Sequence, residues 1–133
     1  MHTTPPAEHG ARSDAGSASV SIAIVFPAIA LLFLALAQAV MVAAAHQVAL
    51  AAAEDGLRVA RAHHATLTGG RTAALRFARQ EPVLLVPQVA VSGGTSITVT
   101  VHGRAPSLLP GVRLAVAATA HGAREVFTTG QGT

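Results

Sequence analysis

The segment VSIAIVFPAIALLFLALAQAVMVAAA, residues 20–45, decides how this chain folds. It carries no charge, and its two strongly polar residues are Ser21 and Gln38. A helix needs about 20 consecutive apolar residues to cross a bilayer, and this segment is longer than that. The alanine-rich pattern then continues through residues 46–53 before charged residues appear. The sequence therefore predicts one helix that begins in a membrane and continues well outside it.

We expect this helix to run from about Ser17 to about His64. At ~1.5 Å per residue it would be on the order of 70 Å long, of which a bilayer core takes ~30 Å. Pro27 lies inside it and should kink it, because proline lacks the backbone N–H that a helix interior uses. Gly56 is a second soft point, since glycine costs about 1 kcal/mol relative to alanine inside a helix.

The chain divides by composition into three regions. Residues 1–16 are polar and contain two adjacent prolines, which predicts a disordered leader. Residues 17–65 form the transmembrane and projecting helix. Residues 66–133 form a small head with a frayed tail. Because the chain contains no cysteine, no disulfide can support so small a head, and packing on the projecting helix should help to stabilise it.

The head is predicted to contain a second helix at Arg71–Gln80, because residues 66–70 (TLTGG) should break the first helix and Pro82 should end the second. Residues 83–86 are candidates for a short buried strand. Alternating apolar residues predict an antiparallel sheet with strands at 89–92, 96–102 and 112–121, and Val126-Phe127 as an extension. The expected fold class is α+β and pilin-like.

The hairpin register follows from the alternation of apolar residues. Odd registers alone place all the apolar side chains of the first two strands on one face. A three-residue turn at Gly93-Gly94-Thr95, with glycine in a left-handed conformation, pairs Val91 with Ile97 and Val89 with Val99.

Composition argues against several kinds of chemistry. The nine arginines are scattered and the chain has no Trp or Tyr for base stacking, so nucleic acid is not expected as a partner. The histidines show no metal-ligand spacing, and no carboxylate pair suggests acid–base catalysis. We therefore expect no catalytic, cofactor-binding or metal residues, and no enzyme activity.

Two groups of residues are candidates for contacts with other helices or subunits. Ala35, Ala39 and Ala43 form a ridge of small residues of the kind that lets membrane helices approach closely. The other group consists of charged residues after the apolar segment, and it is either a solvated collar or a docking surface for a neighbouring subunit: Glu54, Asp55, Arg58 and Arg61.

Several stretches together resemble the TadE-like proteins, the minor pseudopilins of the tight-adherence (Flp-type) pilus assembly system. They are DAGSASV at residues 14–20, VFPA at 25–28, AAAEDGLRVA at 51–60 and VTVHGRAPSLLPG at 99–111. The resemblance covers roughly residues 14–130. The Glu-x-Gly-x-Arg element after the apolar segment and the connection Gly-Arg-Ala-Pro-Ser-Leu strengthen it.

The resemblance implies a single-pass protein of the cytoplasmic membrane with its C-terminal domain outside. Its partners would be membrane lipid, other pilin-like or Tad assembly subunits and, transiently, a prepilin peptidase that cuts after Gly16. The mature chain would then begin at Ser17. Pilins and many family members have glutamate five residues after the cut, where this chain has Ser21. That difference argues against stable incorporation into a filament.

A different function remains open from the residues alone. Arg12, the apolar run at residues 22–36 and Ala43-Ala44-Ala45 fit the parts of a cleaved signal peptide. In that case the product would be a small secreted binding domain. The mature N-terminus separates the two hypotheses, because Ser17 or an intact Met1 favours the pseudopilin and His46 favours the secreted domain.

Overall fold

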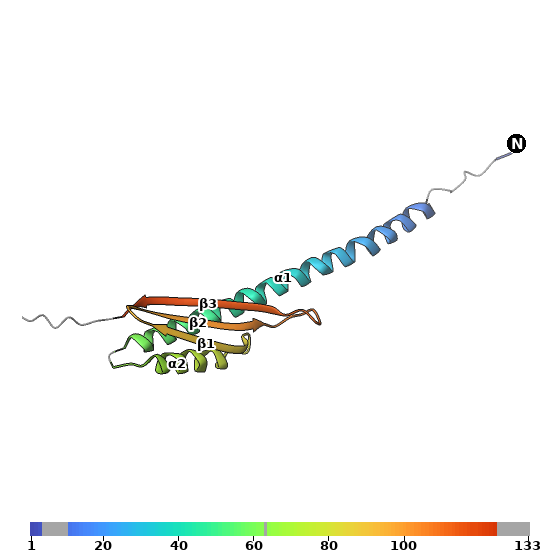
Figure 1. Ribbon diagram of the computed structural model, residues 1–133. Coiled ribbons are helices and arrows are strands. Elements are labelled where there is room, and N and C mark those ends of the chain that lie inside the picture. The colour runs from blue at the N-terminus through green and yellow to red at the C-terminus, as the bar shows by residue number, and fades with distance from the viewer. Residues whose placement is uncertain (4–10, 63, 125–133) are drawn as a thin grey trace, which may run out of the picture. The chain divides into compact units, whose positions relative to one another are not determined.

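The computed structural model describes residues 1–3, 11–62 and 64–124, with the backbone alone for residues 11–15. The elements, drawn in Figure 1, are α1 (Ala11–Arg61), α2 (Leu67–Gln80), β1 (Leu85–Gly93), β2 (Ser96–Ala105) and β3 (Leu114–Ala123). The chain forms two compact units, residues 1–37 and residues 38–133. The boundary lies within α1, so its second half belongs to the head.

The predicted fold class is confirmed. A long apolar N-terminal helix is followed by a second helix and a three-stranded antiparallel sheet in the order β1-β2-β3. This α+β arrangement is pilin-like. Within the head, the second half of α1 and all of α2 cover one face of the sheet, and the other face is exposed.

The bounds of α1 differ from the prediction at both ends. The helix begins at Ala11, so the last residues of the predicted leader are helical; residues 4–10 lie outside the described residues. It ends at Arg61, before the expected His64. His64 has φ 60°, a left-handed conformation that is common just past a helix end.

The sequence predicted that residues 66–70 interrupt the helical structure, but residues 67–70 belong to α2. Thr66 is instead the N-cap of α2, because its Oγ1 accepts a hydrogen bond from the N–H of Gly69 at 3.0 Å. Threonine is among the residues that favour this position. Gly69 and Gly70 therefore lie in the first turn of the helix, although a glycine pair usually signals a loop.

Gly70 is explained by its contact with α1. A Cβ atom added at Gly70 would lie 2.6 Å from the Cβ of Ala60 and 2.7 Å from the carbonyl oxygen of Gly56. One added at Gly56 would lie 2.7 Å from the Cβ of Ala74 and 2.8 Å from the carbonyl oxygen of Gly70. The two glycines thus allow the helices to touch through their backbones. Gly56 is the point of closest packing and not the soft point that its propensity predicts.

The contacts also give the direction of the helices. Gly70 faces Ala60, whereas Ala74, one turn further along α2, faces Gly56, one turn earlier on α1. The two helices therefore run antiparallel in the head. Before Gly56, α1 presents a stripe of alanines to the core, and the completely buried members are Ala45, Ala49, Ala52 and Ala53.

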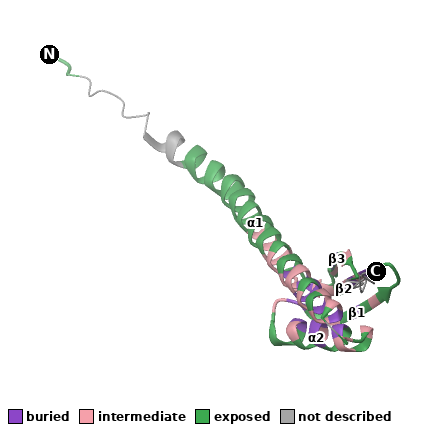
Figure 2. Cartoon of the chain, turned by 90° about the vertical axis from the view of Figure 1, so that its left-hand side faces the viewer, coloured by how far each residue is buried: buried purple, intermediate pink, exposed green. Residues whose placement is uncertain are grey.

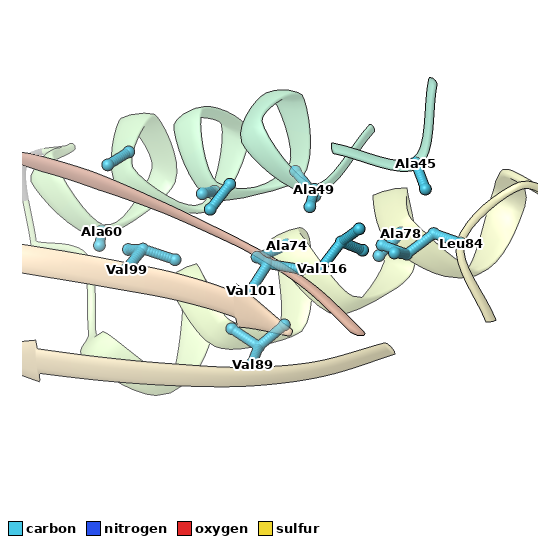
Figure 3. Packing of buried hydrophobic residues seen from close by; sticks show 14 of the residues in the cluster. Ala45, Ala49, Ala60, Ala74, Ala78, Leu84, Val89, Val99, Val101 and Val116 are labelled. Atoms are coloured by element: carbon cyan, nitrogen blue, oxygen red, sulfur yellow. The ribbon is translucent and has the colours of Figure 1, made fainter. Parts of the chain in front are cut away.

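The sheet supplies the large side chains of the core. Ile97, Val99 and Val101 of β2 alternate with partly or fully exposed residues and are at most 1% exposed. Figure 3 shows these aliphatic side chains facing the alanines of α1 and α2. The face that the alternation assigned to the core is thus confirmed.

The hairpin register is confirmed in parity and corrected in position. Val91 pairs with Val99 and Val89 with Val101, a shift of two residues along β2 from the predicted pairs. A shift of two residues keeps every side chain on the same face. The prediction of a left-handed glycine in this turn is wrong. Among the glycines of the described residues, the one with a positive φ is Gly111, which lies outside this turn.

Close packing explains why two glycines lie within strands rather than in loops. A Cβ added at Gly93 would lie 2.9 Å from Cδ2 of Leu67, so this glycine gives space to the first residue of α2. A Cβ added at Gly103 would lie 2.4 Å from Cδ1 of Leu84. β2 continues past Gly103 to Ala105, three residues beyond its predicted end.

The remaining strand bounds are also adjusted. The predicted strand at residues 83–86 is wrong for Val83 and for Leu84, which is buried but lies outside the sheet. β1 begins at Leu85 and includes Pro87, which an edge strand can accommodate. β3 begins at Leu114 rather than at residue 112. The predicted extension at residues 126–127 lies outside the described residues.

The close contact of α1 and α2 predicts an effect on stability opposite to the one expected from helix propensity. Gly70→Ala should gain up to ~1 kcal/mol in helix propensity, but the added methyl overlaps the backbone and Ala60 of α1. Overpacking typically costs ~1–3 kcal/mol, so we expect a net loss of stability in chemical denaturation. Gly94→Ala is the control, since its Cβ meets nothing within 4 Å. A Gly70→Ala protein as stable as the parent would mean that the helices do not meet here.

Candidate membrane anchor and docking site

The first half of α1 is covered with exposed apolar side chains. In the described part of the chain, α1 is the one helix long and apolar enough to cross a membrane. Figure 2 shows this part of α1 as exposed. Its exposed large hydrophobic residues are Val20, Ile22, Ile24, Val25, Phe26, Ile29, Leu31, Leu32, Phe33, Leu36 and Val40. A long exposed apolar N-terminal helix of this kind is typical of a membrane anchor or a signal sequence.

Ser21 is accommodated in this apolar surface by its own helix. Its hydroxyl donates a hydrogen bond to the carbonyl oxygen of Ser17 at 3.0 Å. A serine that bonds back to the preceding turn presents no unsatisfied donor, so it costs much less in lipid than the glutamate found here in the resembling proteins.

The predicted cleavage site lies inside regular helix. Gly16 and Ser17 are exposed residues of α1, and a Cβ at Gly16 would meet nothing within 4 Å. Space around the bond is therefore open. A peptidase that cuts an extended chain would have to unwind the start of α1 at this point.

The alanine ridge and Pro27 also lie on α1. Ala35, Ala39 and Ala43 are all exposed, so they are not part of the packed alanine stripe that begins at Ala45. Their role in membrane helix packing stays a prediction. Pro27 lies within α1, and the helix continues on both sides of it; the kink likewise stays a prediction.

The charged residues of the predicted collar separate into two groups. Arg58 forms an ion pair with Asp55 on the outer surface of α1, and Glu54 is exposed beside them. Arg61 is half-buried, and its side chain lies against Gly122, near the end of β3. The structure therefore brings Glu54, Asp55 and Arg58 together but assigns Arg61 to packing within the head. A docking role for the exposed group stays a prediction.

The polar group that sequence reasoning missed is Gln38. Its Nε2 donates to the carbonyl oxygen of Pro106 at 3.0 Å, and its Oε1 accepts from the N–H of Leu108 at 2.8 Å. One side-chain amide thus binds the connection between β2 and β3 through two backbone groups. We call this contact the Gln38 clasp.

A signal for the clasp was present in the sequence. Gln38 precedes Ala45 by seven residues, so both lie on the helix face that packs in the head. An isolated amide in an apolar run is costly unless both its donor and its acceptor are bonded. The partner could not be predicted, because it lies about 70 residues away in a loop without regular structure.

The described residues offer little for catalysis or metal binding. They contain no cluster of three or more histidine, cysteine, aspartate or glutamate side chains that could hold a metal ion. A shallow groove of ≈ 540 Å³ runs along the outer side of α2, and its walls are Thr68, Arg71, Thr72, Leu75, Arg76, Arg79 and Gln80. Its walls carry no carboxylate. That the protein is not an enzyme remains an expectation.

No family model, no curated protein and no solved structure matches the chain.

The clasp gives a local prediction. Gln38→Leu keeps the helix apolar but removes both hydrogen bonds, each of which is worth ~0.5–1.5 kcal/mol net. We expect a loss of about 1–2 kcal/mol and faster hydrogen exchange at the amide of Leu108. Gln47→Leu, at an exposed glutamine of the same helix, is the matched control. Unchanged exchange at Leu108 in Gln38→Leu would contradict the clasp.

Proposed function

We propose that this protein is a membrane-anchored, TadE-like minor pseudopilin that acts in the assembly of a Tad/Flp-type pilus or a related secretion system. The observation that carries the proposal is the division of α1. Its first half exposes apolar side chains up to Val40, and its second half buries an alanine stripe from Ala45 under α2 and the sheet. One helix thus serves as both apolar stem and core layer, as in pilins.

The proposed mechanism has two parts. The apolar half of α1 sits in the cytoplasmic membrane and packs against the stems of other pilin-like subunits, with the ridge of Ala35, Ala39 and Ala43 allowing close approach. The head lies on the extracytoplasmic side and docks on neighbouring assembly subunits through exposed groups such as Glu54 and Arg58. No chemistry is required of the protein itself.

Ser21 suggests the place of the subunit in assembly. A glutamate here would be available to a neighbour's N-terminal amine, whereas the Ser21 hydroxyl is engaged with Ser17. This favours an initiating, tip or supporting role over stable incorporation along a filament.

The packing of α1 also bears on the alternative of a secreted domain. A signal peptidase cut after Ala45 would remove Ala45, which is completely buried, and Gln38 with its clasp. The released domain would thus lose one end of its core helix. That loss supports retention of α1.

The anchor can be tested by a charge placed in the exposed apolar stretch. Arginine in the middle of a membrane helix costs ~2.5–3.5 kcal/mol of insertion free energy. Leu32 is 68% exposed, so Leu32→Arg should reduce membrane insertion without disturbing the head. His46→Arg, at an exposed position past the apolar stretch, should leave insertion unchanged. The readout is retention in the membrane after alkaline carbonate washing; full release of the parent protein would exclude the anchor.

Processing can be tested by the mature N-terminus. Co-expression with a prepilin peptidase should yield a chain that begins at Ser17, and Gly16→Leu should block the cut. Ser21→Glu should leave cleavage largely unchanged, because the resemblance ties this position mainly to assembly. Intact-mass measurement of the membrane-extracted protein distinguishes these products. A mature chain that begins at His46 would contradict the pseudopilin proposal and favour the secreted domain.

A further inference from the structure

One end of the head carries its exposed large hydrophobic side chains. Apart from Val40 on α1, the described residues of the head expose five of them, between 43% and 59%: Leu85, Val86, Leu108, Leu109 and Val112. We call these five residues the apolar rim. They come from two segments that are distant in the sequence, the first two residues of β1 and the connection between β2 and β3.

The register of the sheet brings the two segments of the rim together. Leu85 pairs with Arg104, and Ala105 pairs with Leu114, so the start of β1, the end of β2 and the start of β3 lie at the same end of the sheet. In Figure 1 this is the end to which the β2 arrow points. At the opposite end, the turn after β1 and the end of β3 carry small or polar residues, such as Ser92, Gly94 and Thr95.

An irregularity at the start of β1 helps to create the rim. A regular strand with one buried face would bury one of any two consecutive residues. Here the pairing shifts between Leu85 and Gln88, and Val86 has φ 49°. A left-handed conformation is unfavourable for a β-branched residue. Its effect is that Leu85 and Val86 are both exposed.

The rim lies at the end of the head that contains Gln38. Gln38 binds Pro106 and Leu108 directly, and the last exposed large hydrophobic residue of α1 is Val40. From Val20 to Val40 a helix spans about 30 Å, which is close to the thickness of a bilayer core. If residues 20–40 fill the bilayer, the Gln38 clasp holds Leu108 at the membrane–water boundary.

The charges around the rim fit an anionic lipid surface. Three arginines lie in or near the two rim segments in the sequence: Arg79, Arg104 and Arg113. The same stretches contain one carboxylate, that of Glu81. Arginines beside apolar side chains can bind headgroup phosphates while the aliphatic groups enter the interface. The chain has no Trp or Tyr, the residues that most often hold a protein at this depth, so other side chains must supply the interfacial contact.

We propose that the apolar rim is a second membrane contact, in which Leu108, Leu109 and Val112, with Leu85 and Val86, dip into the outer headgroup region of the bilayer. This inference rests on the proposed anchor. The rim would fix the height and tilt of the head above the membrane, which the single helix cannot do alone.

The test uses the absence of cysteine in the chain. Three single-cysteine variants of the full-length protein are labelled with an environment-sensitive fluorophore and reconstituted in phosphatidylcholine–phosphatidylglycerol vesicles. Leu109→Cys reports on the rim, Thr95→Cys on the opposite end of the head and Leu32→Cys on the anchor; all three positions are exposed. Quenching is measured with lipids that carry a nitroxide at shallow or deep acyl positions and with iodide on both sides of the bilayer.

We expect the label at Leu109 to be quenched several-fold more by shallow nitroxide lipid than the label at Thr95, and several-fold less by iodide. The label at Leu32 should respond to the deep nitroxide. If Leu32 responds and Leu109 is quenched only by iodide, the rim inference fails and the anchor stands. If Leu32 does not respond, the anchor itself fails. Shielding of Leu109 from both quenchers that depends on the protein-to-lipid ratio would assign the rim to a second copy of the chain and overturn the lipid contact.

Discussion

The head depends on one close approach, the contact of Gly56 with Gly70. It brings α1 and α2 together through their backbones, and this allows short alanine side chains to fill the space between the helices and the sheet. Alanine loses no side-chain rotamer entropy on burial, but it also removes little apolar surface from water. A core of this kind is stable only if its layers are close, and the two glycines set that distance. The large valine and isoleucine side chains of β2 then complete the core from the other side.

Much of the architecture could be predicted from the sequence because it depends on pattern. The long helix over the uncharged run from Val20, the alternation in β2 and the parity of the hairpin register depend on neighbouring residues, and each was confirmed. The errors concern residues whose role depends on distant partners. Gly56 was interpreted by its local propensity as a soft point and Gly70 as part of a break, whereas their contacts lie on other elements. Of the candidate site, the exposed apolar helix could be predicted, but the Gln38 clasp and the apolar rim needed the fold to bring residues 38, 85 and 108 to one end.

The sheet shows how a small head manages without disulfides. Its outer face carries small and polar side chains, including a hydrogen bond between the hydroxyls of Thr100 and Thr119, and its inner face is covered by two helices. One of those helices is the extension of the proposed anchor. The head therefore obtains a core layer from the continuation of the long apolar helix.

The double role of α1 has a mechanical consequence. Because α1 continues from the stem into the core as one helix, no separate linker segment lies between them. Along α1 towards its C-terminus, the two hydrogen bonds of Gln38 come first among the contacts described above, and the buried alanine stripe follows. Contacts loaded in parallel share a force and yield together, whereas contacts loaded in sequence open one at a time. If the protein acts as proposed, a load on the stem would therefore reach the head through its own core and not through a separate linker.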